Sequence, residues 1–143
     1  MKENILISTG GSGGHVVPAQ TLYEHLKDEF NVFLTSDLRG SKFFENNNKN
    51  FKIINVLPLT QNIFLLPWRV AIFFFSILKS FTYLKSKKIK TIISTGGYMS
   101  LPICISAKIL NLKVILFEPN LVLGRSNLFF LNYCSSILCY SCL

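Results

Sequence analysis

Short apolar runs rich in β-branched residues recur along the chain and are separated by segments with helical spacing. A strand that is covered on both faces of a sheet is apolar almost throughout, so each run predicts a buried strand. The predicted strands lie at residues 5–7, 31–35, 53–56, 91–94, 113–117 and 137–140, and the predicted helices after residue 15 and at 67–85, 101–110 and 125–132. Because strands and helices alternate, we expect an α/β fold, a parallel sheet of about five or six strands with helices on both faces.

The most apolar part of the chain is residues 63–84. Its longest stretch without a charge is residues 70–78, which is too short for a membrane-spanning helix of about 20 mostly apolar residues. Pro67 suits the first turn of a helix, so we interpret residues 67–85 as one long helix.

A single domain can bury only one stripe of this helix against its sheet, so several aromatic side chains are expected on the surface. Exposed aromatic groups next to cations suit an anionic membrane surface, because the apolar groups insert while the cations meet the headgroups. The residues expected to contact the membrane are Trp68, Arg69, Phe73, Phe74, Lys85, Lys87 and Lys88. The alternative is a helix that is buried in the core on all sides.

The charge balance also favours an anionic partner, since 15 Lys and Arg against 7 Asp and Glu give a net charge of +8. The basic residues gather beside Phe and Trp on one amphipathic segment, so we expect no nucleic acid as a partner. The chain is 50% hydrophobic and 15% charged, which excludes an intrinsically disordered protein. Its 143 residues correspond to one domain, and no signal-peptide apolar region follows Met1, so a cytosolic chain is expected.

The cysteines indicate little chemistry. Cys139 and Cys142 form a C-x-x-C, but neither a second pair nor a His cluster accompanies them. A structural zinc site needs four ligands, so we expect reduced thiols, no metal site and no cofactor.

The strongest candidate for chemistry is the loop G-G-S-G-G-H at residues 10–15, between the first strand and the first helix. Glycines let a ligand approach the backbone, and the free N–H groups of a helix N-terminus attract an anion. The spacing matches neither the dinucleotide fingerprint nor the P-loop. The loop therefore predicts a phosphate or sugar-nucleotide site, with a simple tight turn as the alternative. His15 is either a general base or ligand-binding group, or a packed helix-capping residue.

Two further features directly follow predicted strands. Gly96, Gly97 and Tyr98 come after the fourth strand, and Glu118 comes after the fifth. Because ligands gather at the carboxyl ends of parallel strands, these features and the first glycine loop predict one common cleft.

Three motifs carry a resemblance to a known family: G-G-S-G-G-H-V-V-P, G-G-Y-M-S-L-P, and F-E-P-N followed by G-R-S-N. In this order they resemble the N-terminal domain of glycosyltransferase family 28, the MurG family of peptidoglycan synthesis. The resemblance covers residues 1–143 and implies one Rossmann-like half of a two-domain GT-B enzyme. It departs at Phe117 and Pro119, where the family usually has His and Gln, and at Ser12, where Thr is common.

The resemblance implies an inverting transfer of GlcNAc from UDP-GlcNAc to the C4 hydroxyl of the muramoyl sugar of lipid I. His15 and Glu118 are then the two candidates for the base. The donor would be contacted by Ser12, Gly13, Gly14 and Asn120, and the acceptor by Gly11, Gly97 and Tyr98.

The family's second domain, which supplies most of the nucleotide-sugar pocket, has no counterpart in these residues. The resemblance therefore implies the acceptor-side half of the enzyme, peripheral to the cytoplasmic face of the bacterial inner membrane, with a separate C-terminal half as a candidate partner. The alternative is a non-catalytic membrane-docking subunit of a split GT-B enzyme that acts on a lipid-linked sugar. A neighbouring reading frame for a C-terminal half would favour the alternative.

Overall fold

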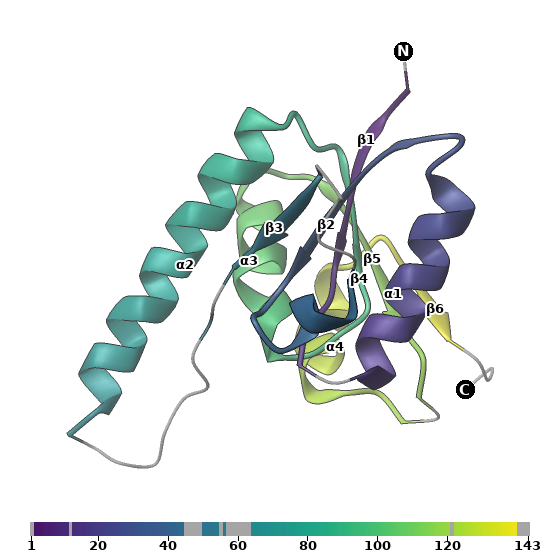
Figure 1. Ribbon diagram of the computed structural model, residues 1–143. Coiled ribbons are helices and arrows are strands. Elements are labelled where there is room, and N and C mark those ends of the chain that lie inside the picture. Colours follow the sequence, from purple (N-terminus) through teal and green to yellow (C-terminus); the bar gives the residue numbers. More distant parts are fainter. Residues whose placement is uncertain are drawn as a thin grey trace.

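The computed structural model describes residues 2–11, 13–44, 50–54, 56, 64–120 and 122–139. Within these ranges the chain forms a six-stranded sheet in the order β3-β2-β1-β4-β5-β6, and every neighbouring pair is parallel (Figure 1). The strands are β1 (Asn4–Ser8), β2 (Asn31–Ser36), β3 (Phe51–Ile53), β4 (Thr91–Ser94), β5 (Lys113–Glu118) and β6 (Ser136–Cys139). The expected α/β fold with a parallel sheet is confirmed.

Helices cover both faces of the sheet (Figure 1). They are α1 (Gly13–Leu26), α2 (Leu66–Ser86), α3 (Leu101–Ile109) and α4 (Arg125–Phe130), with short 3-10 turns η1 (Gly40–Phe43), η2 (Tyr98–Ser100) and η3 (Leu131–Tyr133). Alternate residues of β1 point to opposite faces. Ile5 and Ile7 pack in the cluster that holds Ala19 of α1, whereas Leu6 packs with Ile103 of α3 and Leu84 of α2.

Two boundaries differ from the sequence prediction. The third strand is Phe51–Ile53 and not residues 53–56, because Ile53 pairs with Ser36, the last residue of β2, and pairing ends there. Helix α1 begins at Gly13 and not after residue 15, so its first turn includes the last residues of the predicted glycine loop. The remaining helices and strands begin and end within one or two residues of the prediction.

Helix α2 packs on α3 through small side chains. Its buried residues are Ser76, Ser80 and Leu84, and Ser106 of α3 donates a hydrogen bond to the carbonyl oxygen of Ile77 at 3.0 Å. Small residues let the two helices approach closely. Leu84 and Phe73 of α2 also pack toward the core, whereas Trp68, Phe74 and Phe75 are exposed. The amino end of α2 extends beyond the body of the domain (Figure 1).

Candidate active site

Two glycine turns meet at the carboxyl edge of the sheet, one after β1 and the other after β4. Gly11, Gly96 and Gly97 have φ angles of 85°, 90° and 85°, a conformation that residues with a Cβ rarely adopt. A Cβ at Gly97 would lie 3.0 Å from the carbonyl oxygen of Gly10, so the two turns touch. The prediction that both glycine loops share one edge of the sheet is confirmed.

His15 lies in the first turn of α1 and packs against the second glycine turn. Its Nδ1 is 2.7 Å from the carbonyl oxygen of Thr95, and the Thr95 hydroxyl donates back to the carbonyl oxygen of His15 at 3.1 Å. A carbonyl oxygen only accepts hydrogen bonds, so Nδ1 carries the proton and, in the neutral ring, Nε2 carries the lone pair. The half-buried imidazole is therefore held in the tautomer that can accept a proton at Nε2.

Glu118 ends β5, and its residue is 2% exposed. One carboxylate oxygen accepts the backbone and side-chain N–H groups of Asn120 at 3.1 and 2.8 Å. The other accepts the N–H of Gly124 at 2.8 Å and the side-chain amide of Asn127 at 3.0 Å. Burial raises the pKa of this carboxyl, but the four hydrogen bonds outweigh burial and hold the pKa below its ordinary value. Glu118 therefore stays ionised and fastens the loop after β5 to α4.

Asn127 links this carboxylate to the glycine turns. Asn127 is 1% exposed. A Cβ added at Gly96 would lie 3.3 Å from Nδ2 of Asn127 and 3.3 Å from Cε1 of His15. The amide and the imidazole thus both pack against the backbone of Gly96. Sequence reasoning gave Asn127 no role, although it is the last residue of the G-R-S-N motif.

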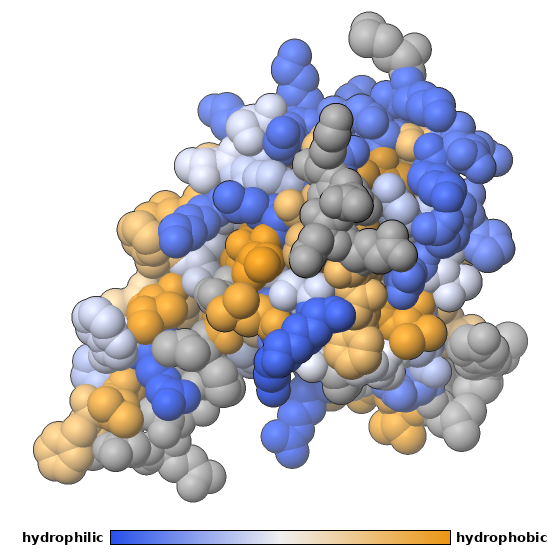
Figure 2. Space-filling model, viewed as in Figure 1, coloured by the Kyte–Doolittle hydropathy of each residue, from blue (hydrophilic) through white to orange (hydrophobic). Residues whose placement is uncertain are grey.

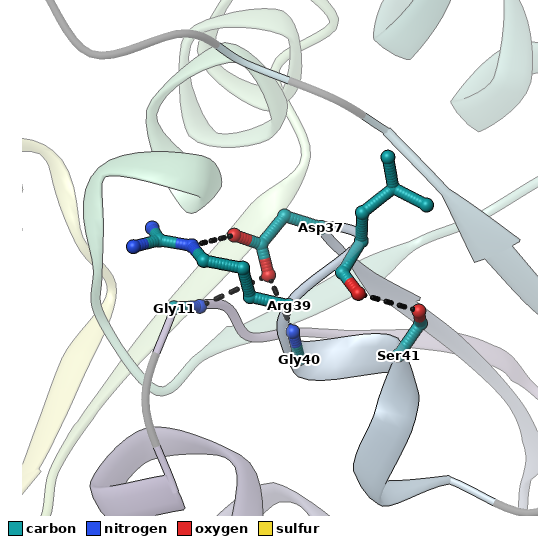
Figure 3. Close-up of polar contacts among 6 residues, drawn as sticks. Gly11, Asp37, Arg39, Gly40 and Ser41 are labelled. Carbon is teal, nitrogen blue, oxygen red and sulfur yellow. Dashed lines mark hydrogen bonds and ion pairs between the residues drawn. The ribbon is translucent and has the colours of Figure 1, made fainter.

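Asp37 is a second buried carboxylate that sequence reasoning missed. It directly follows β2, and its Oδ1 accepts the backbone N–H groups of Gly11 at 3.1 Å and Gly40 at 2.7 Å (Figure 3). Its Oδ2 accepts Nε of Arg39 at 3.1 Å. Burial raises the pKa of Asp37, but these hydrogen bonds and the Arg39 charge outweigh it and lower the pKa. Asp37 therefore ties the first glycine turn to the turn after β2. The signal in the sequence was an acid directly after a strand, as at Glu118.

The other residues expected at the site lie in different surroundings. Gly13 and Gly14 form the first turn of α1 and reach the same edge, while Ser12 lies outside the described residues. Asn120 is exposed, but its amide donates to Glu118. Tyr98 packs its ring on Phe73 at 6.0 Å between centroids and its hydroxyl oxygen is buried, so the structure places it in the core beside the second glycine turn.

The outer face of α2 carries a large exposed apolar surface. The exposed fractions are 67% for Trp68, 62% for Phe74, 59% for Phe75 and 61% for Leu78. Figure 2 shows apolar surface on the part of the molecule that projects beyond the body at this helix. The expectation that several aromatic side chains stay exposed is confirmed. Phe73 is not among them, because it is half-buried against Tyr98.

The cations around this face are spread along the helix. Lys79 lies over the ring of Phe75 at 4.9 Å and Lys85 is on the exposed side, whereas Arg69 is half-buried near the amino end. Lys87 and Lys88 follow the end of α2, where Asn4 of β1 donates a hydrogen bond to the Lys87 carbonyl oxygen. They therefore lie about 30 Å from the start of the helix and do not border its aromatic half. Of the helices in the described ranges, none is long and apolar enough to cross a bilayer.

A parallel sheet covered by helices on both faces, with two glycine turns and a histidine at its carboxyl edge, is the architecture of one half of a GT-B glycosyltransferase. The chain belongs to glycosyltransferase family 28, since it matches the family described as "Glycosyltransferase family 28 N-terminal domain" over residues 5–139.

Curated relatives carry the name UDP-N-acetylglucosamine--N-acetylmuramyl-(pentapeptide) pyrophosphoryl-undecaprenol N-acetylglucosamine transferase. The protein from Pelagibacter ubique (strain HTCC1062) is 56% identical over 141 residues, which are 99% of this chain and 40% of the relative. The protein from Prochlorococcus marinus (strain AS9601) is 33% identical over 144 residues, 96% of this chain and 38% of the relative. The chain thus spans about 40% of the length of its curated relatives.

Solved structures share the fold. The crystal structure of Acinetobacter baumannii MurG matches with a TM-score of 0.84 at 20% identity, over 98% of this chain and 42% of that one. A UDP-N-acetylglucosamine 2-epimerase matches with a TM-score of 0.61 at 14% identity, over 82% of this chain and 33% of that one. At these identities the likeness concerns the fold alone.

Proposed function

We propose that this chain is the acceptor-side half of an N-acetylglucosaminyltransferase that moves GlcNAc from UDP-GlcNAc to lipid I and so makes lipid II. The printed names of the relatives support the two substrates. The observation that carries the proposal is the imidazole of His15, which is oriented by Thr95 and packed against the second of two touching glycine turns.

In the proposed reaction the C4 hydroxyl oxygen of the muramoyl sugar attacks C1 of GlcNAc. The C1–O bond to the β-phosphate breaks, UDP leaves with the electron pair, and the configuration at C1 inverts. Nε2 of His15 takes the hydroxyl proton, because Nδ1–H is engaged with Thr95 and leaves Nε2 as the basic nitrogen.

Of the two base candidates, Glu118 is the weaker. Its lowered pKa and its four hydrogen bonds make it a poor proton acceptor for an incoming hydroxyl. We therefore assign it to positioning: it fixes Asn120, Gly124 and Asn127, and through Asn127 the backbone on which His15 packs.

The two substrates would bind at different parts of the carboxyl edge of the sheet. The backbone N–H groups at the start of α1, with Ser12, Gly13 and Gly14, would face the donor diphosphate, together with Asn120 from the β5 side. Gly11 and Gly97 would face the acceptor, whose own diphosphate is attracted by the same free N–H groups. Tyr98 would support the acceptor side by packing beneath the second glycine turn.

Docking to the membrane would occur through the outer face of α2, on the cytoplasmic face of the bacterial inner membrane and without a spanning segment. The exposed side chains of Trp68, Phe74 and Phe75 support this, as do Lys79, which lies over the ring of Phe75, and Lys85, which is exposed in the last turn of the same helix. Helix α2 runs antiparallel to the strands, so its projecting amino end lies on the side of the glycine turns (Figure 1). A lipid-linked sugar would thus reach the cleft from the docked surface.

The test is transfer of labelled GlcNAc from UDP-GlcNAc to a lipid I analogue. We expect product from this chain joined to the second part of the Pelagibacter ubique relative, and none at a comparable rate from the 143 residues alone. The reason is that orientation of both substrates by two domains lowers such barriers by several kcal/mol. Rapid transfer by the 143 residues alone, or a joined enzyme that ignores the muramoyl acceptor, would contradict the proposal.

A further inference from the structure

Arg39 lies at the mouth of the site but has no part in the proposed reaction so far. It follows β2 and precedes η1, on the side of the sheet away from Glu118. Its side chain is 73% exposed, whereas the side chain of Asp37, to which it is hydrogen-bonded, is only 7% exposed. An exposed guanidinium is thus hydrogen-bonded to a buried carboxylate.

The contact with Asp37 fixes the direction of the guanidinium. Asp37 is itself held by the N–H groups of Gly11 and Gly40, so it cannot follow the arginine (Figure 3). Arg39 uses only Nε in the ion pair, and its two Nη groups point away from the carboxylate. In the part of the chain that the structure describes, no hydrogen-bond partner of either Nη is found.

The free end of the guanidinium faces the first glycine turn. A Cβ at Gly11 would lie 3.7 Å from Nη2 of Arg39, and this is the nearest atom that such a Cβ would meet. Because Gly11 has no side chain, Nη2 of Arg39 stays uncovered on the side of the glycine turn. A phosphate group bound to the exposed Nη groups would therefore lie next to the glycine backbone.

An ordinary surface ion pair does not account for this arrangement. Exposed ion pairs contribute little to stability, and Asp37 already accepts two backbone N–H groups. The two planar Nη groups, by contrast, match the oxygen spacing of a phosphate and can bind it with two parallel hydrogen bonds.

We infer that Arg39 binds a phosphate of the lipid-linked acceptor, with Asp37 as the positioning residue that aims its guanidinium over Gly11. This inference rests on the proposed function and adds a contact to it. We assign Arg39 to the acceptor because of its place in the sheet. Arg39 follows β2, whereas Asn120, which is on the proposed donor side, follows β5, and the strands β1 and β4 lie between β2 and β5.

The first test is binding of inorganic pyrophosphate to the 143-residue chain, measured by calorimetry with orthophosphate as a comparison. Arg39→Gln should weaken pyrophosphate binding by roughly tenfold to a hundredfold, the range for a lost charged hydrogen bond, with an unchanged unfolding temperature. Arg39→Lys should restore only part of the affinity, because an ammonium lacks the planar fork. Asp37→Asn should weaken binding although Arg39 is still present.

Lys113→Gln is the matched control. Lys113 is exposed and starts β5 at the opposite edge of the sheet, so the substitution removes the same charge far from the site. Equal affinities for Arg39→Gln and Lys113→Gln would overturn the inference, as would a wild-type chain that binds no pyrophosphate.

The second test uses the joined enzyme. Arg39→Gln should raise KM for the lipid I analogue by roughly tenfold or more and leave KM for UDP-GlcNAc unchanged. An increase in the donor KM alone would overturn the assignment to the acceptor while leaving the transferase proposal intact. An inactive wild-type joined enzyme would instead count against the proposed function, and the pyrophosphate measurement would still decide the role of Arg39.

Discussion

His15 and Glu118 are equivalent candidates for a base when only their positions after strands are known. Their hydrogen bonds separate them. Nδ1 of His15 is hydrogen-bonded to the Thr95 carbonyl oxygen, which leaves Nε2 available. Each of the two carboxylate oxygens of Glu118, by contrast, accepts two hydrogen bonds. The hydrogen bonds of Glu118 therefore suit a structural role, whereas the unprotonated Nε2 of His15 suits a proton acceptor.

This difference predicts the effect of removing the imidazole. In the joined enzyme, His15→Ala should lower kcat by roughly 10²–10⁴-fold, the usual contribution of a general base, with only a small decrease in unfolding temperature from the lost hydrogen bond to Thr95. The measurement is kcat at saturating UDP-GlcNAc and lipid I analogue. A loss below about tenfold would move the proton transfer to another group.

The two buried carboxylates predict how stability depends on pH. Hydrogen bonds lower the folded-state pKa of Asp37 and Glu118, so both add stability above their unfolded pKa of about 4 and lose it as the pH falls through the folded value. The unfolding temperature of Asp37→Asn/Glu118→Gln should be lower at pH 7 and should fall less than that of wild type between about pH 5 and pH 2. Glu29→Gln, at an exposed carboxylate, should keep the wild-type slope; parallel curves for all three proteins would refute this account.

At the scale of single elements, the glycine turns depend on positive φ angles and close contact. Gly97→Ala should destabilise the domain by about 1–3 kcal/mol, because its φ is 85° and the new Cβ would meet the Gly10 oxygen at 3.0 Å. Gly13→Ala is the control, since its Cβ would have only the Phe43 ring at 3.9 Å and would favour the helix. The measurement is urea unfolding, and equal stabilities of the two variants would contradict the argument.

Helix α2 gives a prediction about membrane binding. Phe74→Ser/Phe75→Ser should strongly reduce co-sedimentation with liposomes that contain anionic lipid, because both side chains are exposed. Lys79→Gln/Lys85→Gln should reduce liposome binding more than Lys87→Gln/Lys88→Gln, since only Lys79 and Lys85 belong to α2. Binding that responds neither to lipid charge nor to these substitutions would exclude docking through α2.

Phe73→Ser is an informative comparison for this experiment. Phe73 is next to Phe74 in sequence but packs inward on Tyr98, so its substitution should lower the unfolding temperature without selectively affecting lipid binding.

At the scale of the whole molecule, the sequence was sufficient for the succession of strands along the chain, for their parallel direction and for the meeting of the glycine loops. Those features depend on local apolar runs and on the geometry of parallel sheets. It was not sufficient for Asp37, Asn127 or Phe73. Their roles depend on which loop or helix lies opposite them, and no local pattern contains that information. The end of β3 was missed for the same reason, because the end of β2 determines where pairing stops.

The direction of α2 relative to the strands has a consequence for how such a domain finds its acceptor. In the proposed docking, the 21-residue helix would lie with one face on the bilayer and would fix both the height and the tilt of the glycine turns above it. The domain would then meet a lipid-linked sugar by diffusion in two dimensions. The proposal therefore implies selection by distance: an acceptor whose diphosphate lies near the headgroup plane would enter the site while its prenyl chain stays in the lipid.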